Sequence, residues 1–195
     1  MFIVAGAQAH SSFKKTQLLN RLASLSSVQS IESQWIYLFD QALNEQQHQS
    51  ALQLLNDGAS FEVRQAESDE IQILVTPRLG TISPWSSKAT DIFANCNTPV
   101  HRLERGVLFT LKGVSEISAE VKLALHDRMT ESVFNQIEDA AALFSETEPK
   151  PLNSIDILGQ GKDALVKANS EFGFALSDEE VAYLTAAFTK MGRNP

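Results

Sequence analysis

Hydrophobic residues in the first half of the chain follow two different periods. Residues 33–39 are dense in aromatic and branched side chains, with Trp35, Tyr37 and Phe39 on one parity and two aliphatic residues on the other, which predicts a strand buried on both faces. Residues 12–25 carry leucines and a phenylalanine at near-helical spacing, which predicts a helix with one buried face. By the same criteria we expect strands at residues 2–5, 71–76 and 103–111, and helices at residues 46–56 and 91–96. This succession of strands and helices predicts an α+β fold.

The second half of the chain shows helical patterns. Residues 116–144 are expected to form a helix, and the charged, proline-bearing residues 146–151 are expected to end it, because proline lacks the N–H that a helix needs. Two more helices are expected at residues 155–172 and 177–191. The second of them begins at Ser177, with Glu180 three residues later, which is the sequence of a capping box. We therefore place a domain boundary at residues 146–151.

The loop after the strand at residues 71–76 is the strongest candidate for a functional segment. Residues 77–92 combine an arginine, a lysine, a tryptophan and several hydroxyl side chains with two prolines and a glycine, so the loop is expected to have a defined shape. Polar loops held by a rigid scaffold often carry function. The candidate residues for contact with a substrate or with another domain are Arg78, Thr81, Ser83, Trp85, Ser86, Lys88 and Asp91.

Two interpretations of this loop remain open from the sequence. Arg78 and Lys88, together with a serine at position 86 or 87 at the start of a helix, could bind an anion, because free N–H groups and the helix dipole favour negative charge there. In the other interpretation the serines only cap the helix, and the two cations pair with Asp91 or Glu104. The second interpretation is favoured, because capping serines are common.

Composition narrows the class of protein. The chain has 195 residues, of which 43% are hydrophobic and 21% are charged, as in an ordinary globular protein. A formal net charge of -8 argues against nucleic-acid binding, which depends on a basic surface. Cys96 is the single cysteine, which excludes an internal disulfide and favours a reducing compartment, so we expect a cytoplasmic protein. The sequence has no signal-peptide pattern and no apolar stretch of membrane-spanning length, so no membrane partner is expected.

No catalytic constellation can be assembled from the sequence. Cys96 could act as a nucleophile with His101 or His126 as its base, but no surrounding motif supports this, and a small buried structural thiol is favoured. The histidines do not pair with one another or with the cysteine at metal-ligand spacing. Residues 159–162 fail as a phosphate loop, because aspartates stand where the first glycine and the magnesium-binding hydroxyl should be. We expect no catalytic, metal or cofactor site in this chain.

The candidate loop resembles a known family signature. Its sequence, Pro77-Arg78-x-Gly80-Thr81-Ile82-Ser83-Pro84-Trp85-Ser86-Ser87-Lys88-Ala89-Thr90-Asp91-Ile92, is similar to the N-terminal signature of the large, single-chain type of phosphoribosylformylglycinamidine synthase. Further segments resemble that family in the same order, at residues 101–106, 125–131, 158–161 and 187–195. The resemblance covers essentially the whole chain and is loosest at residues 44–70.

The resemblance implies that the chain is the front of a multidomain ligase of purine biosynthesis. Members of that family convert formylglycinamide ribonucleotide, glutamine and ATP to formylglycinamidine ribonucleotide, glutamate, ADP and phosphate. It implies that residues 1–145 resemble a dimer of the small subunit, with two ferredoxin-like halves that form a sandwich of antiparallel sheet and helices. It implies that residues 146–151 connect this domain to the start of a small helical linker domain at residues 152–195.

The family's ATP, magnesium and substrate residues lie in a synthetase domain, and its glutaminase residues lie in a C-terminal domain, neither of which matches this chain. The resemblance therefore implies no catalytic residue and no cofactor here, and its implied partners are those two domains of the same polypeptide. The implied role is to dock them so that ammonia passes between them, with residues 77–92 facing the synthetase domain. The alternative is a freestanding binding or regulatory module that senses a phosphorylated metabolite through the same loop. An independent small enzyme has the least support.

Overall fold

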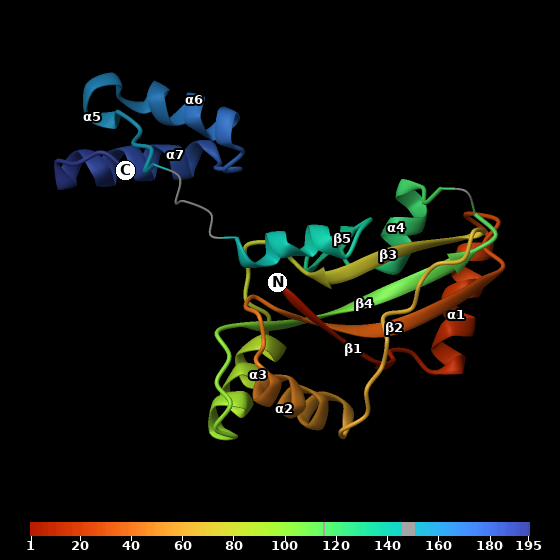
Figure 1. The fold of residues 1–195 in the computed structure, drawn as a ribbon. Coiled ribbons are helices and arrows are strands. Elements are labelled where there is room, and N and C mark those ends of the chain that lie inside the picture. Colours follow the sequence, from red (N-terminus) through yellow and green to blue (C-terminus); the bar gives the residue numbers. More distant parts are fainter. Residues whose placement is uncertain (115, 146–150) are drawn as a thin grey trace. The chain divides into compact units, whose positions relative to one another are not determined.

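The computed structural model describes residues 1–114, 116–145 and 151–195, and it divides the chain into two compact units, residues 1–147 and 148–195. Unit 1 contains the sheet (Figure 1). Its strands are β1 (Phe2–Gln8), β2 (Ser30–Phe39), β3 (Glu70–Pro77), β4 (Leu103–Lys112) and β5 (Glu131–Phe134). Its helices are α1 (Ser12–Ala23), α2 (Glu45–Asn56), α3 (Pro84–Asn95), α4 (Ala119–Leu125) and the 3-10 helix η1 (Glu138–Phe144).

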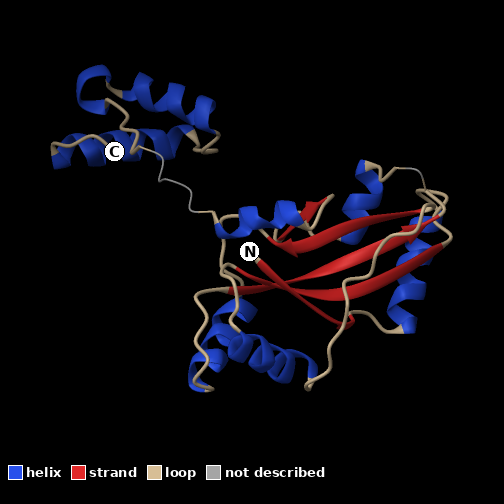
Figure 2. Ribbon diagram, viewed as in Figure 1, coloured by secondary structure: helices blue, strands red, loops and turns tan. Residues whose placement is uncertain are grey.

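The strands form one antiparallel sheet in the order β1-β2-β4-β3-β5 (Figure 2). β2 and β4 lie side by side at its centre and pair along their whole lengths, from Ser30 opposite Lys112 to Phe39 opposite Leu103. β3 pairs with the other edge of β4 and, near its end, with β5. The α+β class predicted from the sequence, with helices packed on an antiparallel sheet and a helical C-terminal segment, is confirmed.

Both faces of the sheet are buried, as the double-sided pattern of β2 predicts. Tyr37 and Phe39 face α2 and α3, and the ring of Phe39 meets that of Phe93 edge-on, with 5.8 Å between the centroids. Other residues of the sheet pack against α1 and α4. Ile36 and Leu38 lie on the opposite face, where they pack against η1. Because each large side chain that is withdrawn from water contributes about 1.5–3 kcal/mol, a slip of β2 by one residue would be costly.

The helix expected at residues 116–144 is wrong, because the chain forms α4, β5 and η1 there. His126 ends α4 in an extended conformation, with φ -138° and ψ 159°. The Asp127 carboxylate then accepts a hydrogen bond from the N–H of Met129 at 2.7 Å, and the Asp127 N–H donates to Glu131 Oε2 at 2.7 Å. These local side-chain bonds compete with a helix, and the edge of β3 pairs with the residues that follow. A long-range pairing therefore overrides the helical pattern.

Unit 2 contains α5 (Ile157–Gln160), α6 (Lys162–Phe172) and α7 (Asp178–Met191), which pack through buried aliphatic residues. The single helix expected at residues 155–172 is wrong, because Gly161, at φ 69° and ψ -150°, separates α5 from α6 in a conformation that glycine adopts far more readily than other residues. The predicted capping box is confirmed, since the Ser177 N–H donates to Glu180 Oε2 at 2.8 Å and the Glu180 N–H donates to Ser177 Oγ at 3.3 Å. Residues 146–150 of the expected connection lie outside the described residues.

Among the helices of the described segments, none combines the length and the hydrophobicity that crossing a lipid bilayer requires.

Candidate functional site

The candidate loop begins where β3 separates from β4. The two strands pair as far as Val75 opposite Val107, and the other edge of β3 pairs with β5 from Leu74 opposite Phe134 to Pro77 opposite Glu131. A side chain at Gly106 would place its Cβ 2.7 Å from the carbonyl oxygen of Val75, so the close approach of the strands at this point requires glycine. Past this pair of residues β3 and β4 no longer pair, and polar side chains lie between the loop and β4.

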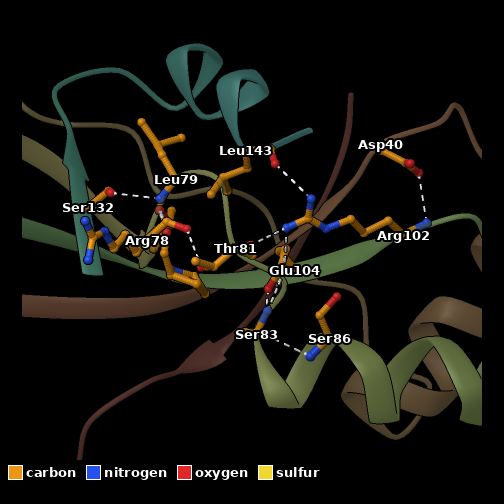
Figure 3. Close-up of polar contacts among 12 residues, drawn as sticks. Asp40, Arg78, Leu79, Thr81, Ser83, Ser86, Arg102, Glu104, Ser132 and Leu143 are labelled. Atoms are coloured by element: carbon orange, nitrogen blue, oxygen red, sulfur yellow. Dashed lines mark hydrogen bonds and ion pairs between the residues drawn. The ribbon is translucent and has the colours of Figure 1, made fainter. Parts of the chain in front are cut away.

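A buried ion pair fills that space (Figure 3). The carboxylate of Glu104 is fully buried and accepts hydrogen bonds from the Ser83 N–H at 3.1 Å and from Ser83 Oγ at 2.6 Å. Arg102 Nη2 donates to Glu104 Oε1 at 2.8 Å and to the carbonyl of Thr81 at 2.8 Å. Arg102 Nη1 reaches the carbonyl of Leu143 in η1 at 2.9 Å. One ion pair therefore fixes the loop to β4 and to η1.

The start of the loop is held by β5 and by the turn before it. The N–H of Arg78 donates to the carbonyl of Thr130 at 2.9 Å, and the N–H of Leu79 donates to Ser132 Oγ at 3.2 Å. Thr81 Oγ1 donates to the carbonyl of Arg78 at 2.7 Å and closes the turn. The defined loop shape that the prolines and the glycine predict is thus produced mostly by hydrogen bonds to neighbouring strands.

Helix α3 begins at Pro84, earlier than the expected helix at residues 91–96. Ser83 is the N-cap, and its Oγ accepts a hydrogen bond from the N–H of Ser86 at 3.0 Å. Proline suits the first helical position because no N–H is needed there. Since the Glu104 carboxylate already lies against Ser83, the negative charge that a helix N-terminus favours is supplied by the chain itself.

The structure brings some of the predicted site residues together and separates others. Thr81 and Ser83 join the Glu104 network, while Ser86 is buried in α3 and its Oγ has no partner among the described residues. Lys88 and Asp91 are exposed on α3, and no ion pair of either is present in the described part of the chain. The cation that pairs with Glu104 is Arg102, a residue outside the predicted set.

Trp85 belongs to a second cluster, on the face of the sheet that α1, α2, α3 and α4 cover. Its ring lies 4.9 Å from the guanidinium carbon of Arg105 and stacks on Tyr37, with 5.9 Å between the centroids. Trp35 lies on the same guanidinium, at 4.6 Å. The sequence prediction missed Arg105. The sequence did carry a signal for it. Arg105 stands at an odd-numbered position of β4, and the other odd-numbered positions of that strand, which face the core with Leu103, are hydrophobic.

Cys96 and the histidines occupy separate surroundings. Cys96 is exposed at the end of α3, so the expectation of a buried thiol is wrong, and its N–H donates to the carbonyl of Ile92 at 2.9 Å. His101 contacts the carboxylate of Asp40, and His126 contacts the carbonyl of Lys122. Within residues 1–114, 116–145 and 151–195, no group of three or more histidine, cysteine, aspartate or glutamate side chains is placed to hold a metal ion.

A comparison with protein families gives a match over most of unit 1. Residues 32–144, more than half of the chain, match the family described as formylglycinamide ribonucleotide amidotransferase N-terminal. The matched region runs from β2 to the end of η1, so it includes the candidate loop, the Glu104 network and the Arg105 cluster. The description names the substrate of the synthase family that the sequence resembles.

Proposed function

Since the chain belongs to the formylglycinamide ribonucleotide amidotransferase N-terminal family, we propose that residues 1–145 dock the synthetase and glutaminase domains of the enzyme and support ammonia transfer between them. The family assigns the chain to an amidotransferase of purine biosynthesis. We also propose that residues 152–195 are the start of its helical linker domain, and that the ATP and magnesium sites lie in the synthetase domain. On this proposal the chain contributes architecture, while the reacting groups belong to the other domains.

The docking proposal rests on one observation: hydrogen bonds to the sheet fix the backbone of the loop, while apolar side chains of the loop are exposed. The Glu104 network and the bonds to β5 fix the backbone of the loop. Leu79 and Ile82 are nevertheless 42% and 62% exposed, and Ile92 on α3 is 51% exposed. Exposed apolar side chains gain free energy when a partner withdraws them from water, and a surface that is already ordered loses less conformational entropy on binding.

Sensing of a phosphorylated metabolite through this loop has less support. The N-terminus of α3 faces the Glu104 carboxylate, which would repel a phosphate group there. Arg78 and Lys88 point to different neighbours, because Arg78 Nη1 reaches the carbonyl of Met129 at 3.4 Å, whereas Lys88 lines a hollow with Leu54 and Ile92. We expect calorimetry of this chain with formylglycinamide ribonucleotide or ATP to show no binding. Binding of either would favour the sensing function.

The docking proposal is tested with Ile82→Asp in the full-length enzyme. Ile82 is exposed, so the substitution places a charge on the docking surface and leaves the loop anchors intact. We expect glutamine-dependent synthesis of formylglycinamidine ribonucleotide to fall by about tenfold, which corresponds to a loss of about 1.4 kcal/mol of docking energy. Synthesis from added ammonia should change little, because the synthetase site itself is untouched.

Phe13→Asp is the matched control. Phe13 is 71% exposed on α1, away from the loop, and the same change there should leave both activities as they are. Equal glutamine-dependent rates for Ile82→Asp and the wild-type enzyme would show that the loop does not dock another domain.

A further inference from the structure

A cavity of about 390 Å³ lies in unit 1, on the face of the sheet that α1, α2, α3 and α4 cover. Its floor is formed by β4 at Gly106 and Val107. Pro84 and Trp85 of α3 line one side, and Leu125 of α4 lines another. The volume suits a small organic molecule, since ligand pockets typically begin at about 300 Å³.

Arg105 brings a positive charge to the wall of this cavity. Its guanidinium lies against the rings of Trp35 and Trp85, and no hydrogen bond or ion pair of its side chain is present among residues 1–114, 116–145 and 151–195. The neighbouring acid, Glu104, is turned to the other face and is occupied by Arg102 and Ser83. A guanidinium carries five N–H donors in a planar fork, and two indole rings shield it from water, which strengthens its attraction for an anion.

Three other polar side chains of the lining, those of Thr76, Ser83 and Glu131, make hydrogen bonds within the chain. Thr76 Oγ1 donates to the carbonyl of Pro77 at 3.0 Å, and Ser83 Oγ donates to Glu104 at 2.6 Å. Glu131 Oε2 accepts the N–H of Asp127 at 2.7 Å. Glu131 also lines the cavity, and its charge opposes the entry of a ligand with two negative charges. Arg105 therefore favours an anion, and Glu131 limits that anion to a single charge.

A flat stack of two rings lines another part of the cavity. The ring of His10 stacks on Phe109, with 5.5 Å between the centroids and 18° between the planes. Burial lowers the pKa of His10, with a further contribution from the nearby Lys14 charge, so the stacked imidazole is neutral near pH 7 and adds no second cation. This stack offers a planar surface on which an aromatic ring packs well.

We propose that this cavity binds a small aromatic carboxylate with one negative charge. The carboxylate accepts two parallel hydrogen bonds from the guanidinium of Arg105, beside the two indoles, and the ring packs against the His10–Phe109 stack. Arg–carboxylate pairs of this kind are among the stronger hydrogen bonds in proteins. The site uses side chains of unit 1 alone, so it is separate from the docking proposal, and its test needs no other domain.

The test uses the 195-residue chain and benzoate as the probe. The chain has two tryptophans, and both lie on the guanidinium of Arg105, so their two indole N–H signals in an NMR spectrum report on this cavity. Titration with benzoate should shift both signals to saturation, with a Kd of about 1 mM or tighter. Benzamide has the same shape without the charge, and it should bind at least about tenfold more weakly. Phenyl phosphate should also bind more weakly than benzoate, because Glu131 repels its second charge.

Variants at Arg105 identify the contact. Arg105→Met should abolish the benzoate shifts, and Arg105→Lys, which keeps the charge without the planar fork, should weaken binding about tenfold. Arg21→Met, an exposed arginine on α1, is the control and should bind benzoate as the wild type does. The dispersion of the other amide signals shows whether each variant is folded. Absence of shifts with benzoate, equal shifts with benzamide, tighter binding of phenyl phosphate, or undiminished binding by folded Arg105→Met would each overturn the proposal.

Discussion

The carboxylate of Glu104 shows how one buried charge can determine the shape of a loop far away in sequence. Leaving it without donors would cost several kcal/mol, so its position in the fold requires Ser83 and Arg102 to lie where they do. Ser83 belonged to the predicted site set, and Glu104 was foreseen only as a partner for Arg78 or Lys88. The sequence could not identify Arg102 as the partner, because that choice depends on where β3 and β4 separate.

His10 gives a prediction about pH. Burial lowers the pKa of its ring from the usual 6.5, and the nearby Lys14 charge lowers it further, so the unfolded chain takes up this proton at a higher pH than the folded chain does. Well above about pH 6.5 the ring is neutral in both states and adds no pH dependence. As the pH falls below that value the free energy of unfolding should decrease, and it should level off once the folded form is protonated too.

Urea denaturation at a series of pH values, from about pH 7.5 down to about pH 5.5, measures this slope. His10→Gln should be less stable than the wild type at every pH, because it loses the stack on Phe109, but its stability should fall less steeply over this range. An identical slope in the variant would show that His10 is not the group responsible.

At the scale of elements, the strands β1 to β4 and the helices α1, α2 and α7 are the features that the sequence predicts best. Period-two burial identified β2, and apolar spacing identified α2, at whose start the structure also shows a capping box of Asn44 and Gln47. These signals are local, so they are visible in the sequence. The start of α3 was missed although its signal is local, a serine N-cap followed by proline at the first helical position, whereas the break after α4 was missed because β5 exists only by pairing with β3.

Ser83 caps α3 and also donates a hydrogen bond to Glu104, and comparison with an ordinary N-cap serine separates the two contributions to stability. Ser11 is the N-cap of α1, where its Oγ accepts the N–H of Lys14 at 3.3 Å, and Ser11→Ala should reduce the free energy of unfolding by about 1 kcal/mol. Ser83→Ala loses the same kind of cap and also leaves the buried Glu104 carboxylate without one donor, so its cost should be about 3 kcal/mol.

Urea midpoints for the two variants, with unchanged m-values, give this comparison directly. The difference between the variants, rather than either value alone, measures the bond between Ser83 and Glu104. Equal midpoints would mean that the Glu104 network does not depend on the serine hydroxyl, and the argument that this network fixes the loop would lose its main support.

At the scale of the whole molecule, the buried hydrophobic residues of each unit pack among themselves. The three clusters of unit 1 surround the sheet, and that of unit 2 joins α5, α6 and α7. Unit 2 is small, and hydrogen bonds from its last residues hold its beginning. Asn194 Oδ1 accepts the N–H of Leu158 at 2.9 Å, Asn194 Nδ2 donates to Asp156 at 3.2 Å, and the carbonyl of Pro195 accepts the N–H of Ile155 at 3.0 Å. If the units are separate domains, as we propose, weakening this contact should affect unit 2 alone.

Asn194→Ala tests that independence. It removes two of the hydrogen bonds that hold the start of α5, so amide hydrogens in α5, α6 and α7 should exchange about tenfold faster, while those of β2 and β4 keep their wild-type rates. Asn135→Ala is the matched control in unit 1, where the Asn135 amide oxygen accepts a bond from Lys122, and it should leave exchange in unit 2 unchanged. Faster exchange in β2 and β4 of Asn194→Ala would mean that both units open in one cooperative step. In that case, residues 1–145 and 152–195 would have to be treated as a single domain, because the core around the sheet would depend on the C-terminal helices.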